Sequence, residues 1–321
     1  MSETRRFKIG VIGDCFRLGP VEGVRKAAEL GADGVQVWAV GGELAPENMS
    51  PAARGDFRKL CADLGLGISA LCGDLGGHGF ELADENAAKV VRSKMIVDLA
   101  VDLGTKVVTT HIGVVPEDRD DPKYAAMLAA CRELGEYAKA AGATFAIETG
   151  PEPAGRLRRF LDDVDSAGVG VNLDPANLVM VLDDDPVAAV HTLADFIVHT
   201  HAKDGVQLKP CDPVAVYGAF ATGGVEGLDI GELFREVPLG EGDVDWDAYL
   251  AALVEVGYSG FLTVEREVGE EPAADIARAI GFLSTAAQKS VSITPRSLRP
   301  RTRPASSLPT PSPSPPTSCS S

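Results

Sequence analysis

Several features that would place the chain in a specialised class are missing from its sequence. No apolar run is long enough to cross a membrane, and no apolar signal-peptide region precedes the first strand-like segment. We therefore expect a cytoplasmic protein without a membrane partner. No CxxC pair occurs, which argues against a disulfide framework or a zinc knuckle; the six scattered cysteines are Cys15, Cys61, Cys72, Cys131, Cys211 and Cys319.

The charge of the chain is strongly one-sided. The net charge is −17, and five of the positive charges but no acidic residue lie in 289–321, so residues 1–288 carry −17 minus five, or −22. A surface this acidic repels the phosphate backbone of nucleic acid, which we therefore do not expect as a partner. A small neutral or weakly charged ligand remains compatible with it.

Residues 289–321 also differ from the rest of the chain in composition. They are rich in proline, serine, threonine and arginine and contain almost no large apolar side chains. Such a segment cannot bury enough apolar surface to offset the entropy lost on ordering. The sequence therefore predicts one folded domain over 1–288 and a disordered tail over 289–321.

Within 1–288, segments rich in valine and isoleucine alternate with longer amphipathic segments. We expect strands at 8–14, 34–40, 67–75, 106–113, 144–150, 169–177, 196–204 and 261–267. The spacing of apolar residues predicts helices most clearly over 85–104, 122–142 and 245–257, and each of these segments ends in a glycine or just before one. This alternation predicts a single α/β domain with the fold of a (β/α)8 TIM barrel. A doubly wound open sheet is the alternative, but it often has a glycine-rich phosphate loop, and no GxGxxG follows the first segment here.

Polar side chains gather at the carboxyl ends of the expected strands, where barrel enzymes place their active sites. The last four strands offer three carboxylates and one imidazole, from Glu148, Asp174, His201 and Glu265. The three carboxylates would repel one another at one point unless a cation lay between them. An oxygen-rich set with a single nitrogen suits Mn²⁺, Mg²⁺ or Co²⁺ better than a structural zinc ion. We therefore predict that these four residues bind one divalent metal ion.

The chain has only five histidines, and two of them, His199 and His201, lie two residues apart in one expected strand. Because side chains alternate along a strand, both point into the barrel if either does, with His201 nearer the mouth. We expect His199 to be a satisfied core histidine. Ordinary structural roles are open to the carboxylates too: a strand-end glutamate is commonly solvated, and Asp174 before a proline can cap the next turn.

The segments AIETG, VNLDPAN, HTHAKD, PLGEGDVDW and FLTVERE together resemble the xylose-isomerase-like barrel superfamily. This superfamily includes ketose 3-epimerases, hydroxypyruvate isomerases and inosose dehydratases, with endonuclease IV as a relative. The resemblance covers roughly residues 7–285 and implies the same four metal ligands, with Glu148 and Glu265 also acting as acid/base groups. One departure changes a substrate contact: many epimerases carry a histidine three residues after the strand-six aspartate, where this chain has Asn177.

This ligand set predicts a sugar isomerase or epimerase that transfers an α-proton of a carbohydrate substrate through an enediolate. The expected substrate contacts are Trp38, His111, Asn177 and Lys203. The long segment 205–243 is expected to be a substrate lid or a contact within a homo-oligomer.

Three alternatives to this function differ in what they require. An inosose or keto-sugar dehydratase stays open, because it uses the same metal site and the same first step. An endonuclease IV-type phosphodiesterase is less favoured, because it needs further histidines that these strand ends lack. A barrel that binds a sugar without turnover can be separated from an enzyme only by an activity measurement.

Overall fold

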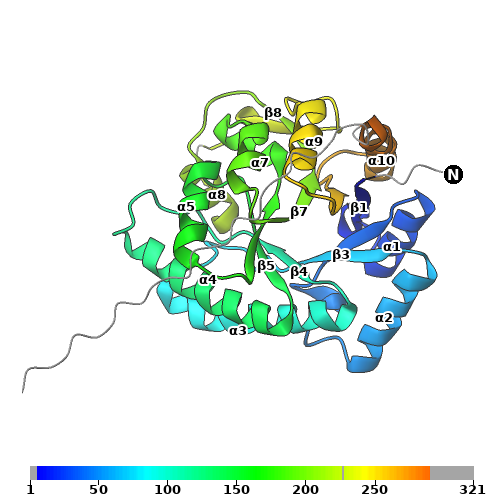
Figure 1. Ribbon diagram of the computed structural model, residues 1–321, viewed down its shortest axis with the longest axis horizontal. Helices are drawn as coiled ribbons and strands as arrows, with labels where there is room; N and C mark the ends of the chain where they lie inside the picture. The colour runs from blue at the N-terminus through cyan, green and yellow to red at the C-terminus, as the bar shows by residue number, and fades with distance from the viewer. Residues whose placement is uncertain (1–5, 226–227, 290–321) are drawn as a thin grey trace, which may run out of the picture.

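Eight parallel strands close into a barrel in the order β1-β10-β7-β6-β5-β4-β3-β2 (Figure 1). The computed structural model describes residues 6–225 and 228–289, so the predicted tail, apart from Lys289, lies outside the described residues. The barrel strands are β1 (Lys8–Ile12), β2 (Gly34–Trp38), β3 (Gly67–Cys72), β4 (Val107–Thr110), β5 (Thr144–Glu148), β6 (Val169–Leu173), β7 (Ile197–Ala202) and β10 (Phe261–Val264). The predicted fold is confirmed. Each expected segment contains one strand, which ends two to four residues early because the polar residues after it belong to loops at the barrel mouth.

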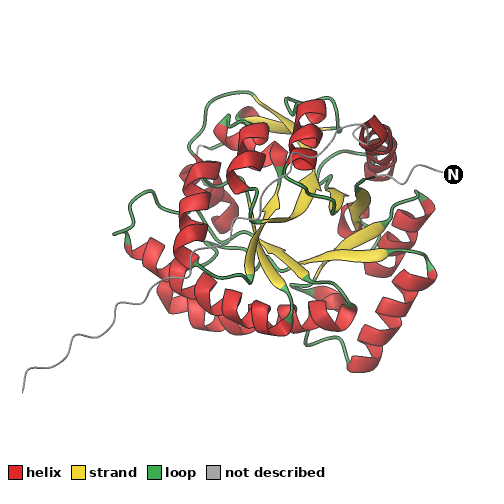
Figure 2. Cartoon of the chain, in the orientation of Figure 1, coloured by secondary structure: helices red, strands yellow, loops and turns green. Residues whose placement is uncertain are grey.

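Helices separate the strands and form a ring outside the barrel (Figure 2). They are α1 (Pro20–Glu29), α2 (Pro51–Asp63), α3 (Ala83–Leu103), α4 (Pro122–Ala141), α5 (Ala154–Val164), α6 (Pro175–Asn177), α7 (Pro186–Leu193), α8 (Pro213–Thr222), α9 (Trp246–Glu255) and α10 (Pro272–Lys289). Short helical turns lie at Gly13–Phe16, Gly42–Leu44, Leu178–Leu182 and Ile230–Glu232.

Local sequence signals set the limits of many of these helices. Proline, which lacks the backbone N–H that a first turn leaves unused, is the first residue of most of them. Asp121 caps α4 by accepting a hydrogen bond from the backbone N–H of Lys123. Gly104 and Gly142, with φ of 88° and 75°, follow α3 and α4 in the left-handed conformation that ends a helix.

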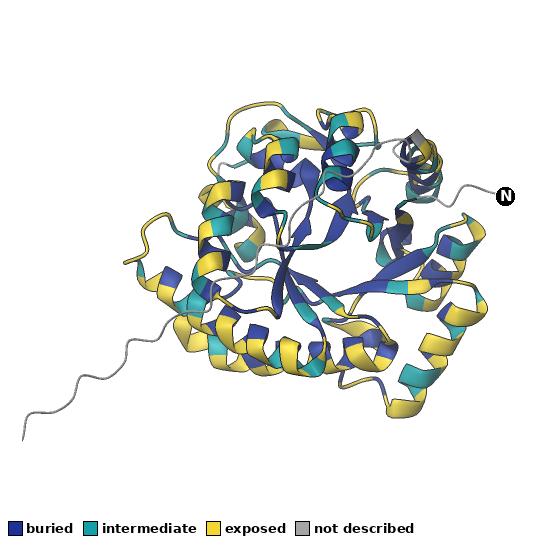
Figure 3. Cartoon of the chain, viewed as in Figure 1, coloured by how far each residue is buried: buried dark blue, intermediate teal, exposed yellow. Residues whose placement is uncertain are grey.

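Apolar packing between the barrel and the helices forms the core. Figure 3 shows buried strands surrounded by helices whose outer faces are exposed. Fully buried side chains include Leu71 and Phe145 on the strands and Ile96 and Phe160 on the helices. Burial of each such side chain contributes roughly 1.5–3 kcal/mol to stability. This packing fixes the strands, and therefore fixes where their carboxyl ends present polar side chains.

The long segment 205–243 contains structure that the sequence did not reveal. Strand β8 (Asp204–Gln207) pairs antiparallel with β9 (Phe234–Val237), and helix α8 lies between them in the chain. The buried carboxylate of Asp204 anchors the base of this excursion: it accepts hydrogen bonds from the N–H of Gly240 (2.8 Å) and from Nε1 of Trp246 (2.9 Å). This ribbon brings α8 back toward the barrel mouth.

Candidate metal centre

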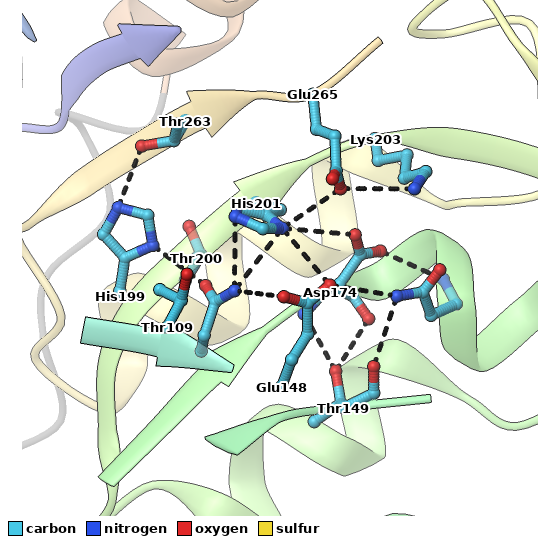
Figure 4. Close-up of polar contacts among 12 residues, drawn as sticks. Thr109, Glu148, Thr149, Asp174, His199, Thr200, His201, Lys203, Thr263 and Glu265 are labelled. Carbon is cyan, nitrogen blue, oxygen red and sulfur yellow. Dashed lines mark hydrogen bonds and ion pairs between the residues drawn. The ribbon is translucent and has the colours of Figure 1, made fainter. Parts of the chain in front are cut away.

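The four residues expected to bind metal converge at the barrel mouth (Figure 4). Glu148 ends β5 and His201 lies in β7, whereas Asp174 and Glu265 directly follow β6 and β10. Parallel strands bring their carboxyl ends to the same side of a barrel, so these side chains meet although they are far apart in sequence. One ligand atom from each of the four lies within 4.8 Å of the others.

The imidazole of His201 presents Nδ1 to the three carboxylates. This atom lies 3.1 Å from Oε2 of Glu265, 3.4 Å from Oε1 of Glu148 and 3.6 Å from Oδ2 of Asp174. The other nitrogen, Nε2, lies 3.2 Å from Oε1 of Gln36, an acceptor. We assign the Nε2–H donor to this hydrogen bond, so Nδ1 is the atom that faces the carboxylates. Nδ1 holds a proton in the imidazolium form and would offer its lone pair to a metal ion in the neutral form.

The electrostatics of the cluster favour a positive charge between its carboxylates. Burial alone would lower the pKa of His201, but the charges of Glu148 and Glu265 raise it well above its ordinary value. Burial would also raise the pKa of Glu265, yet the positive charges of Lys203 and His201 lower it overall. The carboxyl group of Glu265 is therefore ionised at neutral pH.

Two carboxylate oxygens in the cluster have no hydrogen bond. Oδ2 of Asp174 and Oε2 of Glu265 are buried and accept none from any residue in the described part of the chain. Their contacts with Nδ1 of His201, and that of Oε2 of Glu265 with Nζ of Lys203, are ion pairs. Oδ1 of Asp174 caps the short helix α6 by accepting from the N–H of Asn177 (3.0 Å), so this side chain fulfils its turn-capping role and still has one free oxygen. Oxygen ligands lie about 2.0–2.6 Å from Mg²⁺ or Ca²⁺, so ligand atoms of one ion are at most about 5 Å apart. The donor types, their spacing and the two oxygens without hydrogen bonds fit one divalent ion.

A second layer of polar side chains lies below the cluster and supports it. Nδ2 of Asn172 donates to Oε2 of Glu148 (2.9 Å), and Oδ1 of Asn172 accepts from Nδ1 of His199 (2.9 Å). Nε2 of His199 lies 3.0 Å from the hydroxyl of Thr263, and Nε2 of Gln36 donates to the hydroxyl of Thr109 (3.2 Å). Burial lowers the pKa of His199 well below its ordinary value, so this histidine is neutral and fully hydrogen-bonded.

Two of the expected substrate contacts lie at the mouth with groups available to a ligand. The side chain of Trp38 is 46% exposed at the end of β2. Nδ1 of His111 lies 2.9 Å from Oδ2 of Asp74, and its Nε2 lies 3.8 Å from Oε1 of Glu148. Burial lowers the pKa of His111, but the charge of Glu148 and the hydrogen bond with Asp74 outweigh it and raise that pKa to about 9.

The other two expected substrate contacts, Asn177 and Lys203, bind groups of the protein itself. Nδ2 of Asn177 donates to Oε1 of Glu148 (3.2 Å) and to the carbonyl oxygen of Thr149 (3.3 Å). Nζ of Lys203 lies 2.7 Å from Oε2 of Glu267 and 3.2 Å from Oε2 of Glu265. Both residues border the cluster of Glu148, Asp174, His201 and Glu265, and their contact with a substrate stays a prediction.

Sequence reasoning missed three residues of this region: Gln36, Asn172 and Tyr217. Gln36 and Asn172 are single polar residues inside apolar strands, and each lies two positions before a polar mouth residue, so strand alternation offered a signal for them. Tyr217 reaches the mouth from α8, where its ring centroid lies 5.6 Å from that of His111. No local pattern indicates this contact, because it depends on how the 205–243 segment folds back.

Comparisons with known proteins agree with this architecture. The model of the xylose isomerase-like TIM barrel family matches residues 24–286. A search of curated proteins finds no match. Among the described residues, no helix combines the length and the apolar character needed to cross a membrane.

Solved structures with the same fold include proteins of several kinds. A xylose isomerase domain protein from Planctomyces limnophilus is 28% identical, with a TM-score of 0.73 over 90% of this chain and 99% of that one. A D-psicose 3-epimerase studied with D-fructose is 16% identical, with a TM-score of 0.66 over 88% and 99%. A xylose isomerase-like TIM barrel protein from Mycobacterium smegmatis, in complex with magnesium, is 18% identical, with a TM-score of 0.66 over 90% and 100%. The chain belongs to the xylose isomerase-like TIM barrel family.

Proposed function

We propose that this protein is a divalent-metal-dependent sugar isomerase or epimerase that transfers the proton on the carbon next to the substrate carbonyl, through an enediolate. The observation that carries the proposal is the convergence of Glu148, Asp174, His201 and Glu265 around one point. Membership of the family and the fold shared with a ketose epimerase support it.

The four residues would hold the ion through Nδ1 of His201 and carboxylate oxygens that include the free ones of Asp174 and Glu265. A bound divalent ion polarises a carbonyl and stabilises the negative charge that develops on its oxygen. The protein's part is to fix the donors. Gln36 holds the ring of His201, and Asn172 together with Asn177 holds the carboxylate of Glu148.

Glu148 and Glu265 are the proposed proton-transfer groups. Glu148 ends β5 and Glu265 directly follows β10. Strands β6 and β7 lie between β5 and β10 in the barrel, so the two carboxylates approach the site from different sides. Lys203 and His201 keep the carboxyl group of Glu265 ionised, as a base requires. A base on one face of a planar enediolate and an acid on the other invert the carbon; one group serving both positions moves a proton between neighbouring carbons instead.

A dehydratase acting at the same site is the second candidate, and His111 favours it. Its Nε2 has no hydrogen bond within the described residues and faces Glu148, while Asp74 holds its other nitrogen. After the α-proton is removed, a leaving β-hydroxyl group departs as water only if an acid protonates it. His111, with a pKa raised to about 9, is such an acid, and epimerisation by Glu148 and Glu265 does not require a third acid/base group.

The test is metal content combined with proton exchange. We expect about one divalent ion per purified chain, and a lower occupancy in His201→Ala and in Asp174→Ala. The metal-loaded protein is then incubated in D₂O with ketoses, inososes and 3-keto sugars, and NMR follows exchange of the α-proton. Full metal retention by both variants, or no exchange from any bound compound, contradicts the proposal. Formation of an unsaturated product in place of an epimer selects the dehydratase.

A further inference from the structure

Two cationic side chains beside the candidate metal centre, Lys203 and Arg266, form ion pairs with carboxylates. Lys203 is 6% exposed, and its Nζ lies in ion pairs with three acidic side chains, 2.7 Å from Glu267, 3.2 Å from Glu265 and 3.9 Å from Glu236. Nη1 of Arg266 lies 2.7 Å from Oε1 of Glu236, and its Nε lies 2.9 Å from Oδ2 of Asp275. Both cations are therefore paired with carboxylates, which compete with a phosphate group for them.

The formal charge of the site stays negative even with an ion bound. The groups in contact at the mouth include seven carboxylates, from Asp74, Glu148, Asp174, Glu236, Glu265, Glu267 and Asp275. They include four cations, from His111, Lys203, Arg266 and Arg278, with His201 counted as a neutral ligand of the ion. Seven negative and four positive charges leave an excess of three, of which a divalent ion neutralises two. A phosphate dianion entering this field is repelled, whereas an uncharged ligand is not.

Tyr217 supplies a polar group of the kind that an uncharged ligand uses. Its side chain is half-buried, its ring packs against that of His111, and its hydroxyl makes no hydrogen bond with any described residue. The hydroxyl lies against the backbone two residues after Glu148: a Cβ atom on Gly150 would be only 2.4 Å from Oη of Tyr217. Burial and the charges of Glu148 and Asp174 raise the pKa of Tyr217 well above its ordinary value, so the group remains a hydroxyl that can donate.

We propose that the site takes an unphosphorylated, uncharged polyhydroxy ketone and that Tyr217 is a specificity residue whose hydroxyl binds one of the hydroxyl groups of that ketone. This inference rests on the proposed function, which it narrows to a substrate class. Helix α8 is then the element that carries the specificity residue, and the β8–β9 ribbon holds this helix over the mouth.

The experiment compares binding within matched pairs of compounds. Isothermal titration calorimetry on the metal-loaded full chain compares the binding affinity of D-fructose with that of D-fructose 6-phosphate, and that of D-tagatose with that of D-tagatose 6-phosphate. Each free ketose is expected to bind more tightly than its ester. Tyr217→Phe keeps the ring and removes one hydrogen bond, so it should weaken binding of the free ketose by roughly three- to tenfold. Val214 is an exposed position on the same helix, so Val214→Ala should leave the affinity for the ketose unchanged. Neither variant should change the affinity of the protein for the metal ion.

The outcomes separate this inference from the proposed function. An ester that binds as tightly as its ketose, or the failure of both free ketoses to bind, overturns the substrate class. An unchanged affinity in Tyr217→Phe overturns the role of Tyr217. Exchange of the α-proton in D₂O is recorded on the same samples: a ketose that binds without exchange refutes the proposed function and leaves the inference about binding intact.

Discussion

Replacement of Gln36 by methionine tests whether the layer below the metal centre controls metal affinity. Gln36 is 1% exposed and holds two partners, because its Oε1 lies 3.2 Å from Nε2 of His201 and its Nε2 donates to the hydroxyl of Thr109. Methionine has a similar length and volume, so the variant removes both hydrogen bonds without opening a large cavity.

The expected size of the effect follows from these contacts. Without an acceptor at Nε2, the ring of His201 can rotate or change its tautomer, and Nδ1 is no longer fixed toward the carboxylates. Loss of such an outer partner typically lowers metal affinity about 10- to 100-fold, or about 1.4–2.7 kcal/mol. The N–H of His201 that is left buried without an acceptor should also lower the free energy of unfolding by about 1–3 kcal/mol.

Calorimetric titration of Mn²⁺ at one fixed pH measures the metal affinity, and urea denaturation measures the stability. Gln207→Met is the matched control: Gln207 ends β8 on the ribbon, and its side chain donates to the carbonyl oxygen of Met180 (3.1 Å) in the helical turn Leu178–Leu182. We expect Gln207→Met to bind Mn²⁺ like the unmodified protein. A Gln36→Met variant that binds Mn²⁺ with the same affinity as this control would refute the account of how His201 is positioned.

Three further predictions concern stability. Burial raises the pKa of Glu152 from an ordinary 4.5 to about 7. Between pH 4.5 and about pH 7 the folded state therefore holds a proton that the unfolded state lacks, so the free energy of unfolding falls as the pH rises through this range. Glu152→Gln should therefore stabilise the protein by about 3 kcal/mol at pH 8 and hardly at pH 4.5, and an equal effect at both pH values in urea denaturation contradicts this. Asp204→Ala, which leaves Gly240 N–H and Trp246 Nε1 without their acceptor, should cost about 2–6 kcal/mol, and a loss under 1 kcal/mol would disprove the anchoring role. Truncation after residue 288 should leave the melting temperature unchanged, because the composition beyond it does not support packing, whereas a fall of several degrees would show that the proposed division at 288 is wrong.

The barrel was predictable because its signals are local and repeated. Each strand is a short apolar run, and glycines such as Gly104 and Gly142 mark helix ends by their left-handed conformation. The meeting of Glu148, Asp174, His201 and Glu265 then followed from topology alone, since parallel strands bring their carboxyl ends together. Their roles as ligands and proton carriers remain a proposal, which geometry supports and measurement must decide.

The same reasoning could have predicted part of the polar layer below the barrel mouth. Alternation along a strand places Gln36 below Trp38, and Asn172 below Asp174, just as it places His199 below His201. The contact of Lys203 with Glu236 and the position of Tyr217 were not predictable in this way. Both depend on the β8–β9 ribbon, which forms between segments about 30 residues apart and shows no hairpin turn signal in the sequence.

The central claim is that Glu148 and Glu265 carry protons as well as bind metal, and one measurement tests it most directly. Glu148→Gln and Glu265→Gln are saturated with Mn²⁺, and exchange of the substrate α-proton in D₂O is followed from each epimer of a ketose pair. Glutamine keeps the shape and one ligating oxygen but cannot accept a proton, so exchange should slow by about a hundred- to ten-thousand-fold. Each variant should block exchange mainly from one epimer, because the two carboxylates serve opposite faces. Metal-saturated variants that exchange both epimers at nearly the unmodified rate would contradict the account.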